Sequence, residues 1–412
     1  MKSIAKKYLE AVEDALKMIR GRASKYSVKI GDDLIAWGQH IDQTSSQYGI
    51  YGTSAAIEML DLIDADESYD KPIPAEIKKA LNFLKKLFED KSFFVSAEGT
   101  SNYQLSVLPK LSSILSCLSL RLIDREATAR DVRDYAIEKI KKSQNSDGGW
   151  PAYNPKFIDE TCTETIPSDP LITAAVLSAV VKSEVKDEIN LQNAINYLKN
   201  SLHNTNLPIH TQLYSIFAIR AALPEQIDEF IKNKSEELIK AFADIFPNIL
   251  EVYHPFDVTD TRENKTTAHY FVVKQKTLFL NYLSRFEFTR FCNKKWLSRA
   301  VDTVNYVIEN QGGEKSKISF RIGTRNTLSA VRFLIQSKKN VKANKRKANL
   351  IYYGTKILHS IKTRYILIGI LILVSYFISP TLSSNQGLGF FLGVIASIIA
   401  AMVYNLLTKS DN

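Results

Sequence analysis

Residues 143–153 of this chain read SQNSDGGWPAY. This stretch lies between two segments in which apolar residues recur at helical spacing. Gly148 and Gly149 allow the backbone conformation that ends a helix and reverses the chain. Asp147 can accept hydrogen bonds from nearby backbone N–H groups, as in a helix cap or an Asx turn. The stretch therefore predicts a tight connection between two helices.

Two larger side chains of the same stretch also have a structural interpretation. Gln144, on the last turn of the preceding helix, can bond free backbone groups at the end of a neighbouring helix. Trp150 can cover the connection with a large apolar ring. We interpret residues 144–150 as a clamp that fixes one helical repeat to the next, and not as a catalytic site.

Helical periodicity continues outward from this stretch over residues 1–340, with almost no strand-like alternation. Helices are predicted near residues 3–22, 48–63, 74–90, 101–123, 127–143, 168–183, 187–202, 207–223, 225–244, 265–287, 293–311 and 322–338.

Every second helix of this set carries a charged stripe, whereas the helices between them are apolar around the whole circumference. A helix that is apolar on all sides must be buried, and a helix with a charged stripe can face water. The alternation predicts an all-α fold, an α/α toroid of about six outer and six inner helices over residues 1–340. An open superhelical solenoid is the structural alternative, and it requires polar capping repeats that we do not identify clearly.

Composition limits the compartment and the cofactors. The three cysteines lie far apart in the 412 residues, which favours a reducing compartment over a disulfide framework. The six histidines are equally scattered, so we expect no metal site and no cofactor. The N-terminal segment carries acids through its apolar pattern, which is typical of an amphipathic helix and not of a signal peptide.

The net charge of +10 is concentrated in one segment. Residues 338–364 hold nine Lys or Arg and no acid, and the rest of the chain is near neutral. Two apolar segments follow, 365–378 and 387–407, joined by an uncharged turn. The pattern predicts a basic juxtamembrane linker at 341–364 and a two-helix transmembrane hairpin over 365–407. A hydrophobic helical hairpin buried in a soluble core is the alternative.

The charges on both sides of the hairpin predict its orientation. The positive-inside rule places both ends in the cytoplasm, so we expect a two-span protein of the inner or plasma membrane with a cytoplasmic N-terminal domain and C-terminus. Because the basic segment is explained by topology and by contact with anionic headgroups, no nucleic-acid partner is expected. Small residues recur through the second apolar segment and favour a homo-oligomer formed through the membrane helices.

Three stretches carry a resemblance to a known family. QNSDGGW, residues 144–150, resembles the QW repeat of the squalene-hopene and oxidosqualene cyclases and of their prenyltransferase relatives. QYGIYGT, residues 47–53, resembles a second stretch of that family, and PSDPLITAAVLSAV, residues 167–180, resembles the segment that follows a QW turn. The resemblance implies the α/α toroid fold, in agreement with the helix pattern, and covers residues 30–340 in architecture.

The departures from the family concern its chemistry. The resemblance places the proton donor of a cyclase, an Asp in a DxDDTA setting, at Leu171, which cannot donate a proton. The string DVTDT holds Asp257 and Asp260, which would share a helix face as a candidate acid pair. Capping of a helix that begins near Lys265 is the alternative for both. Cys162 lacks the spacing of a prenyltransferase zinc ligand, so this comparison adds no metal site.

A ligand site is predicted at the mouth of the toroid. Trp37 and His40 lie in the long first connection, and Tyr48 and Tyr51 lie at the start of the helix that follows. An aromatic rim of this kind suits an apolar or extended ligand. Packing over helix ends is the alternative role for each of the four residues.

Together these patterns favour a membrane-anchored, non-catalytic α/α toroid that binds an isoprenoid-like apolar ligand or a protein partner and signals to the hairpin. Two alternatives stay open: a membrane-bound isoprenoid or terpenoid cyclase or prenyltransferase-like enzyme, and a membrane-perturbing effector of a bacterial defence system. A deep, closed and aromatic cavity would favour the enzyme, and a cavity filled by side chains would favour a scaffold.

Overall fold

A computed structural model of the chain describes residues 3–38, 48–89, 107–151, 166–184, 189–224, 228–245, 257–260, 265–268, 272–310, 324–359, 389–390 and 393–394. The chain divides into two compact units. The first unit comprises Met1–Phe291 and Arg299–Ala343, and the second comprises Cys292–Ser298 and Asn344–Asn412. The described residues are mainly helical, which confirms the all-α class.

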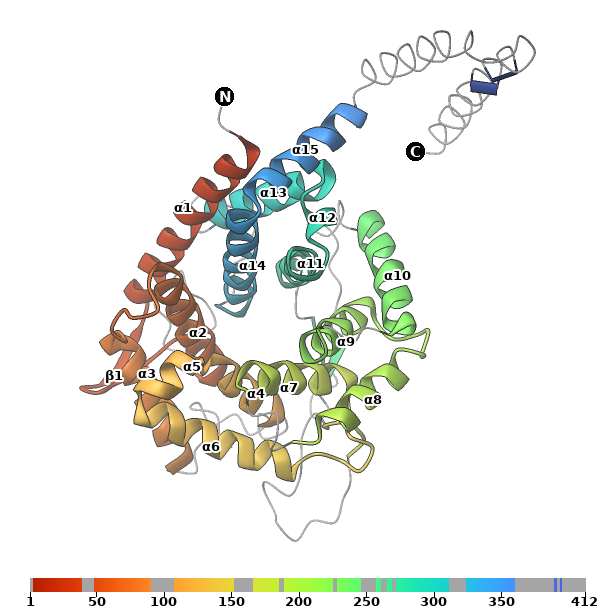
Figure 1. Cartoon of the computed structure of the whole chain (residues 1–412). Coiled ribbons are helices and arrows are strands. Elements are labelled where there is room, and N and C mark those ends of the chain that lie inside the picture. The colour runs from red at the N-terminus through yellow and green to blue at the C-terminus, as the bar shows by residue number, and fades with distance from the viewer. Residues whose placement is uncertain are drawn as a thin grey trace. The chain divides into compact units, whose positions relative to one another are not determined.

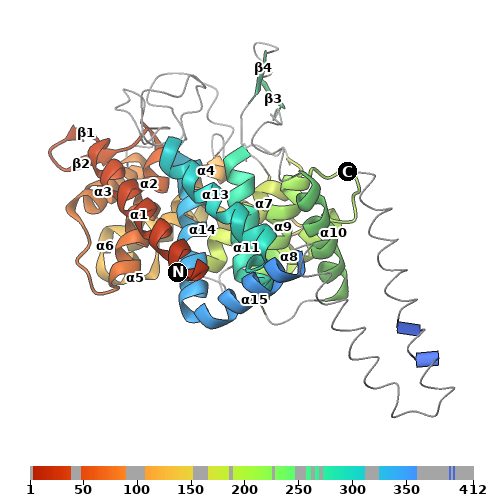
Figure 2. The same ribbon diagram turned by 90° about the horizontal axis from the view of Figure 1, so that it is seen from above.

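Six helices of the first unit form a closed series of contacts, which can be followed by label in Figure 1. α2 packs against α4, α4 against α7, α7 against α9 and α9 against α11; α11 packs against α14, and α14 packs against α2. Figure 2 shows α11 and α14 side by side. We call these six the central helices. Their bounds are α2 Ile50–Glu67, α4 Val107–Cys117, α7 Pro170–Lys182, α9 Ile209–Ala222, α11 Val272–Phe286 and α14 Thr324–Ala343.

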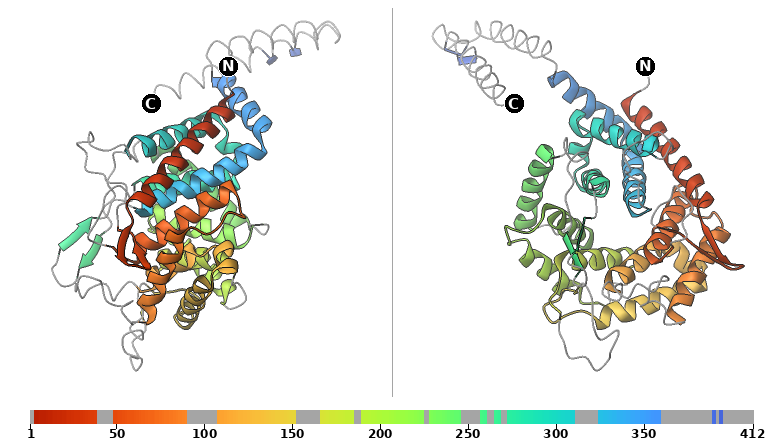
Figure 3. Two further views of the ribbon diagram at one scale, coloured as in Figure 1. Left: turned by 90° about the vertical axis from the view of Figure 1, so that its left-hand side faces the viewer. Right: turned by 180° about the vertical axis from the view of Figure 1, so that it is seen from behind.

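Further helices of the first unit flank this series. α1 packs against α2 and α14, α3 against α2, α6 against α4, α8 against α7 and α9, and α10 against α9. Figure 3 shows α1, in red, alongside α14, in blue. The bounds of the flanking helices are α1 Ile4–Lys25, α3 Ala75–Glu89, α6 Ala127–Lys142, α8 Leu191–Ser201 and α10 Glu229–Ile245. The short helices α5 and α12 span Leu120–Arg125 and Phe288–Phe291. α13 spans Lys294–Asn310, and its residues up to Ser298 belong to the second unit.

Residue patterns explain why the two sets differ. α1 buries a stripe that includes Tyr8, Val12 and Ile19, and its other faces carry charges, so it can flank the unit. Ser3 caps α1 by accepting a hydrogen bond at 3.3 Å from the backbone N three residues on. α2 instead buries almost every residue between Ile50 and Asp64 and therefore needs partners on all sides.

Two short hairpins interrupt the helical pattern. β1 Val28–Gly31 pairs with β2 Leu34–Ala36, and β3 Asp257–Asp260 pairs with β4 Lys265–Ala268, both in antiparallel orientation. The helix predicted from residue 265 begins only at Val272, so that prediction is wrong for residues 265–268. The β4 sequence KTTA contains two threonines, whose β-branched side chains favour an extended backbone over a helix.

The second unit contains α15, Lys345–His359. Within this unit the backbone N of Lys294 donates to Thr355 Oγ1 at 2.9 Å. Among the residues that the structure describes, no helix has both the length and the apolar character needed to cross a membrane. The predicted hairpin over 365–407 lies outside the described residues, apart from 389–390 and 393–394.

Candidate functional site

Trp150 joins α6 to α7 through hydrogen bonds to three residues. Its indole Nε1 donates to the carbonyl oxygen of Ile140, near the end of α6, at 2.9 Å. Its backbone N donates to Thr173 Oγ1 in α7 at 2.9 Å, and its carbonyl oxygen accepts from the backbone N of Asp169 at 2.9 Å. Trp150 is fully buried. We call Trp150 with these three partners the second joint.

The polar side chains of the turn close it and tie it to α8. Gln144 Nε2 donates to the carbonyl oxygen of Gly148 at 2.9 Å and to that of Asn190, the N-cap residue of α8, at 3.1 Å. Asp147 Oδ1 accepts from the backbone N of Gly149 at 2.9 Å. The turn therefore contacts a third helix as well as the two that it connects.

Close approach of other segments explains the two glycines. Gly148 has φ +89°, and a Cβ at this position would lie 2.5 Å from backbone atoms of Asn193. A Cβ on Gly149 would lie 2.5 Å from the Cβ of Ser168. No other residue type fits either position without a shift of the neighbouring chain.

Trp37 makes the same kinds of hydrogen bond between α1 and α2. Its indole Nε1 donates to the carbonyl oxygen of Ala23, near the end of α1, at 2.7 Å. Its backbone N donates to Thr53 Oγ1 in α2 at 3.1 Å, and its carbonyl oxygen accepts from the backbone N of Gly49 at 3.2 Å. Trp37 is fully buried too. We call this arrangement the first joint.

The two joints share a register. Thr53 and Thr173 each stand four residues after the N-cap residue of their helix, Gly49 in α2 and Asp169 in α7. Recurrence of one geometry at two helix connections is the mark of an internal structural repeat. The first joint also gives Trp37 a packing role in place of the predicted ligand-binding role, because its indole N–H already donates to Ala23.

The other residues predicted to bind a ligand have different surroundings. Tyr51 lines the cavity described below. The ring of Tyr48 packs edge-on against that of Phe83, with 5.9 Å between the ring centroids. His40 lies outside the described residues. Leu171 is the second residue of α7 and is half-buried.

Asp257 and Asp260 form the two ends of β3. Their predicted pairing assumed the residue spacing of a helix face, whereas the backbone here is an extended strand. The helix that they would cap does not start at Lys265 either, because that residue begins β4. Cys162 lies outside the described residues.

A cavity of about 130 Å³ lies within the first unit. All six central helices contribute residues to its lining. Most of these residues are polar. The hydroxyl groups come from Tyr51, Ser112, Ser113, Ser116, Ser178, Tyr214 and Ser329, and the charged groups from Glu58 and Arg332.

Glu58 of α2 holds two cations at this cavity. Arg332 of α14 binds both carboxylate oxygens, with Nε to Oε1 at 2.6 Å and Nη2 to Oε2 at 2.6 Å. Lys182 at the end of α7 places Nζ 2.6 Å from Glu58 Oε1 and donates to the carbonyl oxygen of Ser116 in α4 at 2.5 Å. We call Glu58, Arg332 and Lys182 the Glu58 cluster. It links four of the central helices.

Burial and charge act against each other within the Glu58 cluster. Burial alone raises the pKa of Glu58, but Arg332 and Lys182 outweigh it and hold the pKa below its usual value. Burial lowers the pKa of Lys182, and the charge of Glu58 opposes that effect only in part. Arg332 keeps a raised pKa because Glu58 outweighs its burial. Glu58 is therefore a fixed anion at neutral pH.

Glu58 is the first of a row of acids along α2. Asp61, Asp64 and Glu67 follow at intervals of three residues, and Glu58, Asp61 and Asp64 are all buried. Residues three apart on a helix lie on neighbouring parts of one surface. Because buried carboxylates need partners, the row fixes α2 against several other helices at once.

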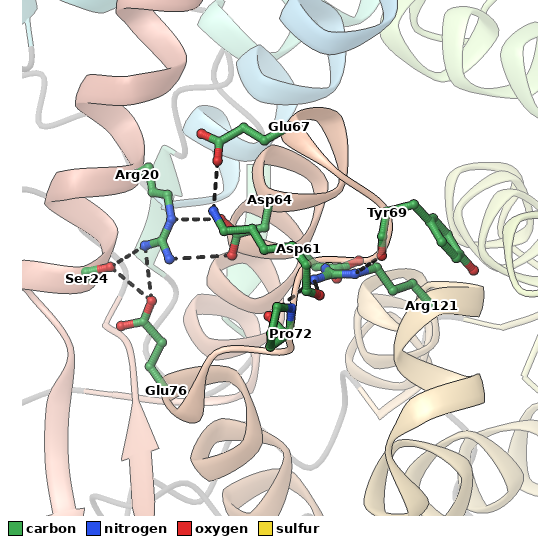
Figure 4. A network of polar contacts seen from close by, with 10 residues as sticks. Arg20, Ser24, Asp61, Asp64, Glu67, Tyr69, Pro72, Glu76 and Arg121 are labelled. Atoms are coloured by element: carbon green, nitrogen blue, oxygen red, sulfur yellow. Dashed lines mark hydrogen bonds and ion pairs between the residues drawn. The ribbon is translucent and has the colours of Figure 1, made fainter.

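Figure 4 shows the partners of the later acids in this row. Asp61 accepts from Arg121 Nη1 of α5 at 2.5 Å, and Asp64 accepts from Arg20 Nε of α1 at 2.9 Å. Lys71 binds Asp64 as well, with 3.1 Å between Nζ and Oδ1. None of these residues is among those that line the cavity, so we assign the pairs to packing.

The Glu58 cluster was missed from the sequence, although a signal was present. The segment IEMLDLIDADE, residues 57–67, lies in a helix interpreted as apolar on all sides, yet it carries acids at a spacing of three. Acids at that spacing in an otherwise buried helix indicate internal ion pairs. Their partners are distant in sequence, since Arg332 follows Glu58 by 274 residues, and no local pattern identifies them.

Two further observations limit the chemistry of the described residues. No group of three or more His, Cys, Asp or Glu side chains among them could hold a metal ion. Burial, reinforced by the charge of Glu58, raises the pKa of the Cys117 thiol, which makes it a poor nucleophile. Comparison with known protein families, curated proteins and solved structures finds no match to this chain.

Proposed function

We propose that this protein is a membrane-anchored ligand-binding protein whose first unit is an α/α toroid. The closed series of contacts among the central helices supports a toroid over an open solenoid, in which the first and last helices would not meet. The two joints support the internal repeats that such a fold contains.

The cavity carries the proposal. Every central helix contributes to its lining, from Tyr51 in α2 to Arg332 in α14. A ligand in the cavity would contact the whole series and would favour the state in which the series is closed. A ligand that binds only the folded state stabilises that state by mass action. A ligand in this cavity would therefore stabilise the contacts among all the central helices.

The same cavity favours binding over cyclisation. A class II cyclase needs a carboxylic acid that keeps its proton until it protonates the substrate. The acid in this cavity is Glu58, and its two cationic partners stabilise the ionised form. Together with Leu171 at the position that the resemblance gives to the donor, this supports a non-catalytic role.

Size and polarity favour a small polar ligand over the isoprenoid-like ligand expected from the aromatic residues of the sequence. Cavities that take drug-sized ligands measure roughly 300–1,000 Å³ and are mostly apolar. This cavity, at about 130 Å³, combines hydroxyl groups and two charged groups with apolar residues such as Phe217 and Leu278. It has room for several water molecules or for one small polar molecule.

Membrane attachment rests on the sequence. The basic segment 341–364 and the apolar segments within 365–407 support an anchor that holds the first unit at the cytoplasmic face. The effector alternative depends on the same apolar segments, which lie outside the described residues apart from 389–390 and 393–394. We therefore propose the anchor and leave the effector as a prediction.

A cavity-filling variant tests the ligand-binding role. Full-length protein would be purified in mild detergent as wild type, as Ala175→Leu, which fills the cavity, and as Ala127→Leu, an exposed position on α6. Small molecules released on denaturation would be measured by mass spectrometry. We expect one compound, near one per chain, from wild type and Ala127→Leu but not from Ala175→Leu. Equal amounts from all three proteins, or none from any, would contradict the proposal.

Fractionation of cells tests the anchor. Full-length protein should sediment with membranes and dissolve only with detergent, whereas a chain that ends at Arg364 should be released by high salt. The basic segment alone holds a protein to anionic lipid only weakly once its charges are screened. Salt release of the full-length chain would contradict the anchor.

A further inference from the structure

We propose that the cavity binds an oxyanion, such as the phosphate group of a small molecule, and that Arg332 is its main anchor. This inference rests on the proposed ligand-binding function and names the chemical class of the ligand. The argument depends on the unused hydrogen-bond donors, on the charge of the Glu58 cluster and on the hydroxyl groups beside it.

Arg332 has donors to spare. Its Nε and one N–H of Nη2 bind Glu58, and Nη1 has no hydrogen-bond partner among the described residues. Arg332 lines the cavity, and its side chain keeps 39% of its surface accessible. Glu58 holds one edge of the guanidinium group and leaves the other for a ligand. A guanidinium edge presents two parallel N–H groups, the geometry that binds two oxygens of a phosphate or carboxylate.

The charges of the cluster do not balance. Glu58 contributes one negative charge and Arg332 one positive charge, and Lys182 adds a second positive charge in its protonated form. The neighbouring buried pair, Asp61 with Arg121, is neutral in sum and does not offset the difference. An excess of positive charge attracts an anion, so an anionic ligand next to Arg332 would balance it. A cationic ligand would increase the excess.

Two hydroxyl groups extend the site. Ser329 stands one helical turn before Arg332 on α14, and Ser178 lines the cavity from α7. Neither hydroxyl group has a hydrogen-bond partner among the residues that the structure describes. Serine hydroxyl groups rotate freely and donate to oxyanions. Together with the Arg332 edge they provide donors from two of the central helices.

Equilibrium dialysis of the full-length protein in detergent against radiolabelled inorganic phosphate tests the proposal. Ionic strength would be held constant with chloride, because phosphate also stabilises proteins by exclusion from their surface. We expect saturable binding of one phosphate per chain, with competition by sulfate and none by choline. Absence of saturable binding would overturn the proposal.

Substitutions in the cluster separate recognition from structural support. Arg332→Lys loses the planar edge and should weaken phosphate binding by about tenfold or more. Glu58→Gln keeps the shape and an acceptor for Arg332 but removes the competing anion, so binding should tighten by about tenfold. Asp134→Asn, an exposed position on α6 outside the lining, should leave binding unchanged.

The direction of the Glu58→Gln effect is decisive. If Glu58 only supported the structure, its replacement would weaken phosphate binding or leave it unchanged, and either result would overturn the proposal. Circular dichroism would check that each variant folds. Should Arg332→Lys fail to fold, Ser329→Leu blocks the same side of the cavity and should abolish phosphate binding without loss of helix.

Further outcomes separate this inference from the proposed function and identify the source of the oxyanion. A compound that Ala175→Leu cannot retain and that lacks any acidic group would leave the ligand-binding function standing and overturn the oxyanion. Competition by glycerol phosphate supports a soluble phosphate ester as the ligand. Competition by phosphatidate in micelles, without competition by glycerol phosphate, supports a lipid headgroup as the source of the same oxyanion.

Discussion

The first and second joints make equivalent hydrogen bonds from unlike sequences. In both, a buried Trp donates its indole N–H to the flanking helix and its backbone N–H to a Thr in the central helix. The second joint follows the turn SQNSDGGW, whereas the first follows the β1–β2 hairpin, with the sequence LIAWG around its Trp. The Trp and Thr are therefore the constant part of the joint.

The variable part reflects what lies beside each joint. At the second joint Gln144 bonds Asn190 of α8, and Gly148 makes room for the backbone of Asn193. At the first joint the close approach falls on Gly52, where a Cβ would lie 2.1 Å from the carbonyl oxygen of Gly38. Gly38 in turn accepts from Thr324 Oγ1 of α14. One joint thus contacts the next flanking helix, and the other contacts the last central helix.

Removal of the Trp ring gives the largest expected effect and tests whether the joints are equivalent. Trp37→Ala and Trp150→Ala should each lower the free energy of unfolding by about 3–5 kcal/mol, because a fully buried aromatic side chain leaves a large cavity. Urea unfolding of the full-length protein in detergent, followed by circular dichroism, measures the change.

Tyr69→Ala provides a control for the Trp substitutions, since Tyr69 is 53% exposed. That substitution should change the free energy of unfolding by less than about 0.5 kcal/mol. A large loss of unfolding free energy in Trp150→Ala with a small loss in Trp37→Ala would show that the two joints do not contribute equally to stability.

Replacement of the joint Thr hydroxyl should have an intermediate effect at both joints. Thr53→Val and Thr173→Val each leave the buried backbone N–H of a Trp without its acceptor, which costs about 1–3 kcal/mol. Thr→Ser at the same positions keeps the acceptor and should recover most of the loss. A Ser variant with a lower urea midpoint than the Val variant would show that the methyl group, and not the hydroxyl group, matters.

Local patterns were sufficient for the second joint and for the helical class. The glycines, Asp147 and Gln144 lie within a few residues of the backbone groups that they bind, apart from the contact of Gln144 with Asn190. The first joint could not be found in this way, because the turn sequence QNSDGG that precedes Trp150 has no counterpart before Trp37. Its equivalence to Trp150 depends on Thr53, which becomes visible only when the helix start at Ile50 is known.

Long-range ion pairs set the limit of sequence-based prediction for the cavity. Aromatic residues suggested an apolar site, yet of the three predicted ligand residues that the structure describes only Tyr51 lines the cavity. Its charged residues, Glu58 and Arg332, come from helices at opposite ends of the first unit's sequence. Hydropathy averages over a helix conceal buried acids, because most of the residues around the acids of α2 are small or apolar.

Loss of the Gln144 amide should have the smallest effect on stability and should affect the second joint alone. Gln144→Ala removes two hydrogen bonds to backbone carbonyls in a half-exposed turn, so the free energy of unfolding should fall by about 1 kcal/mol. Hydrogen exchange should become faster in residues 148–150 and at the start of α8, where the amide group held two segments together. Exchange around Trp37 should not change, because the bond from the first joint to a third helix joins Gly38 to Thr324 and does not involve Gln144. Faster exchange at Trp37 as well would mean that the two joints are coupled through the central helices, and the local part of the comparison would then be wrong.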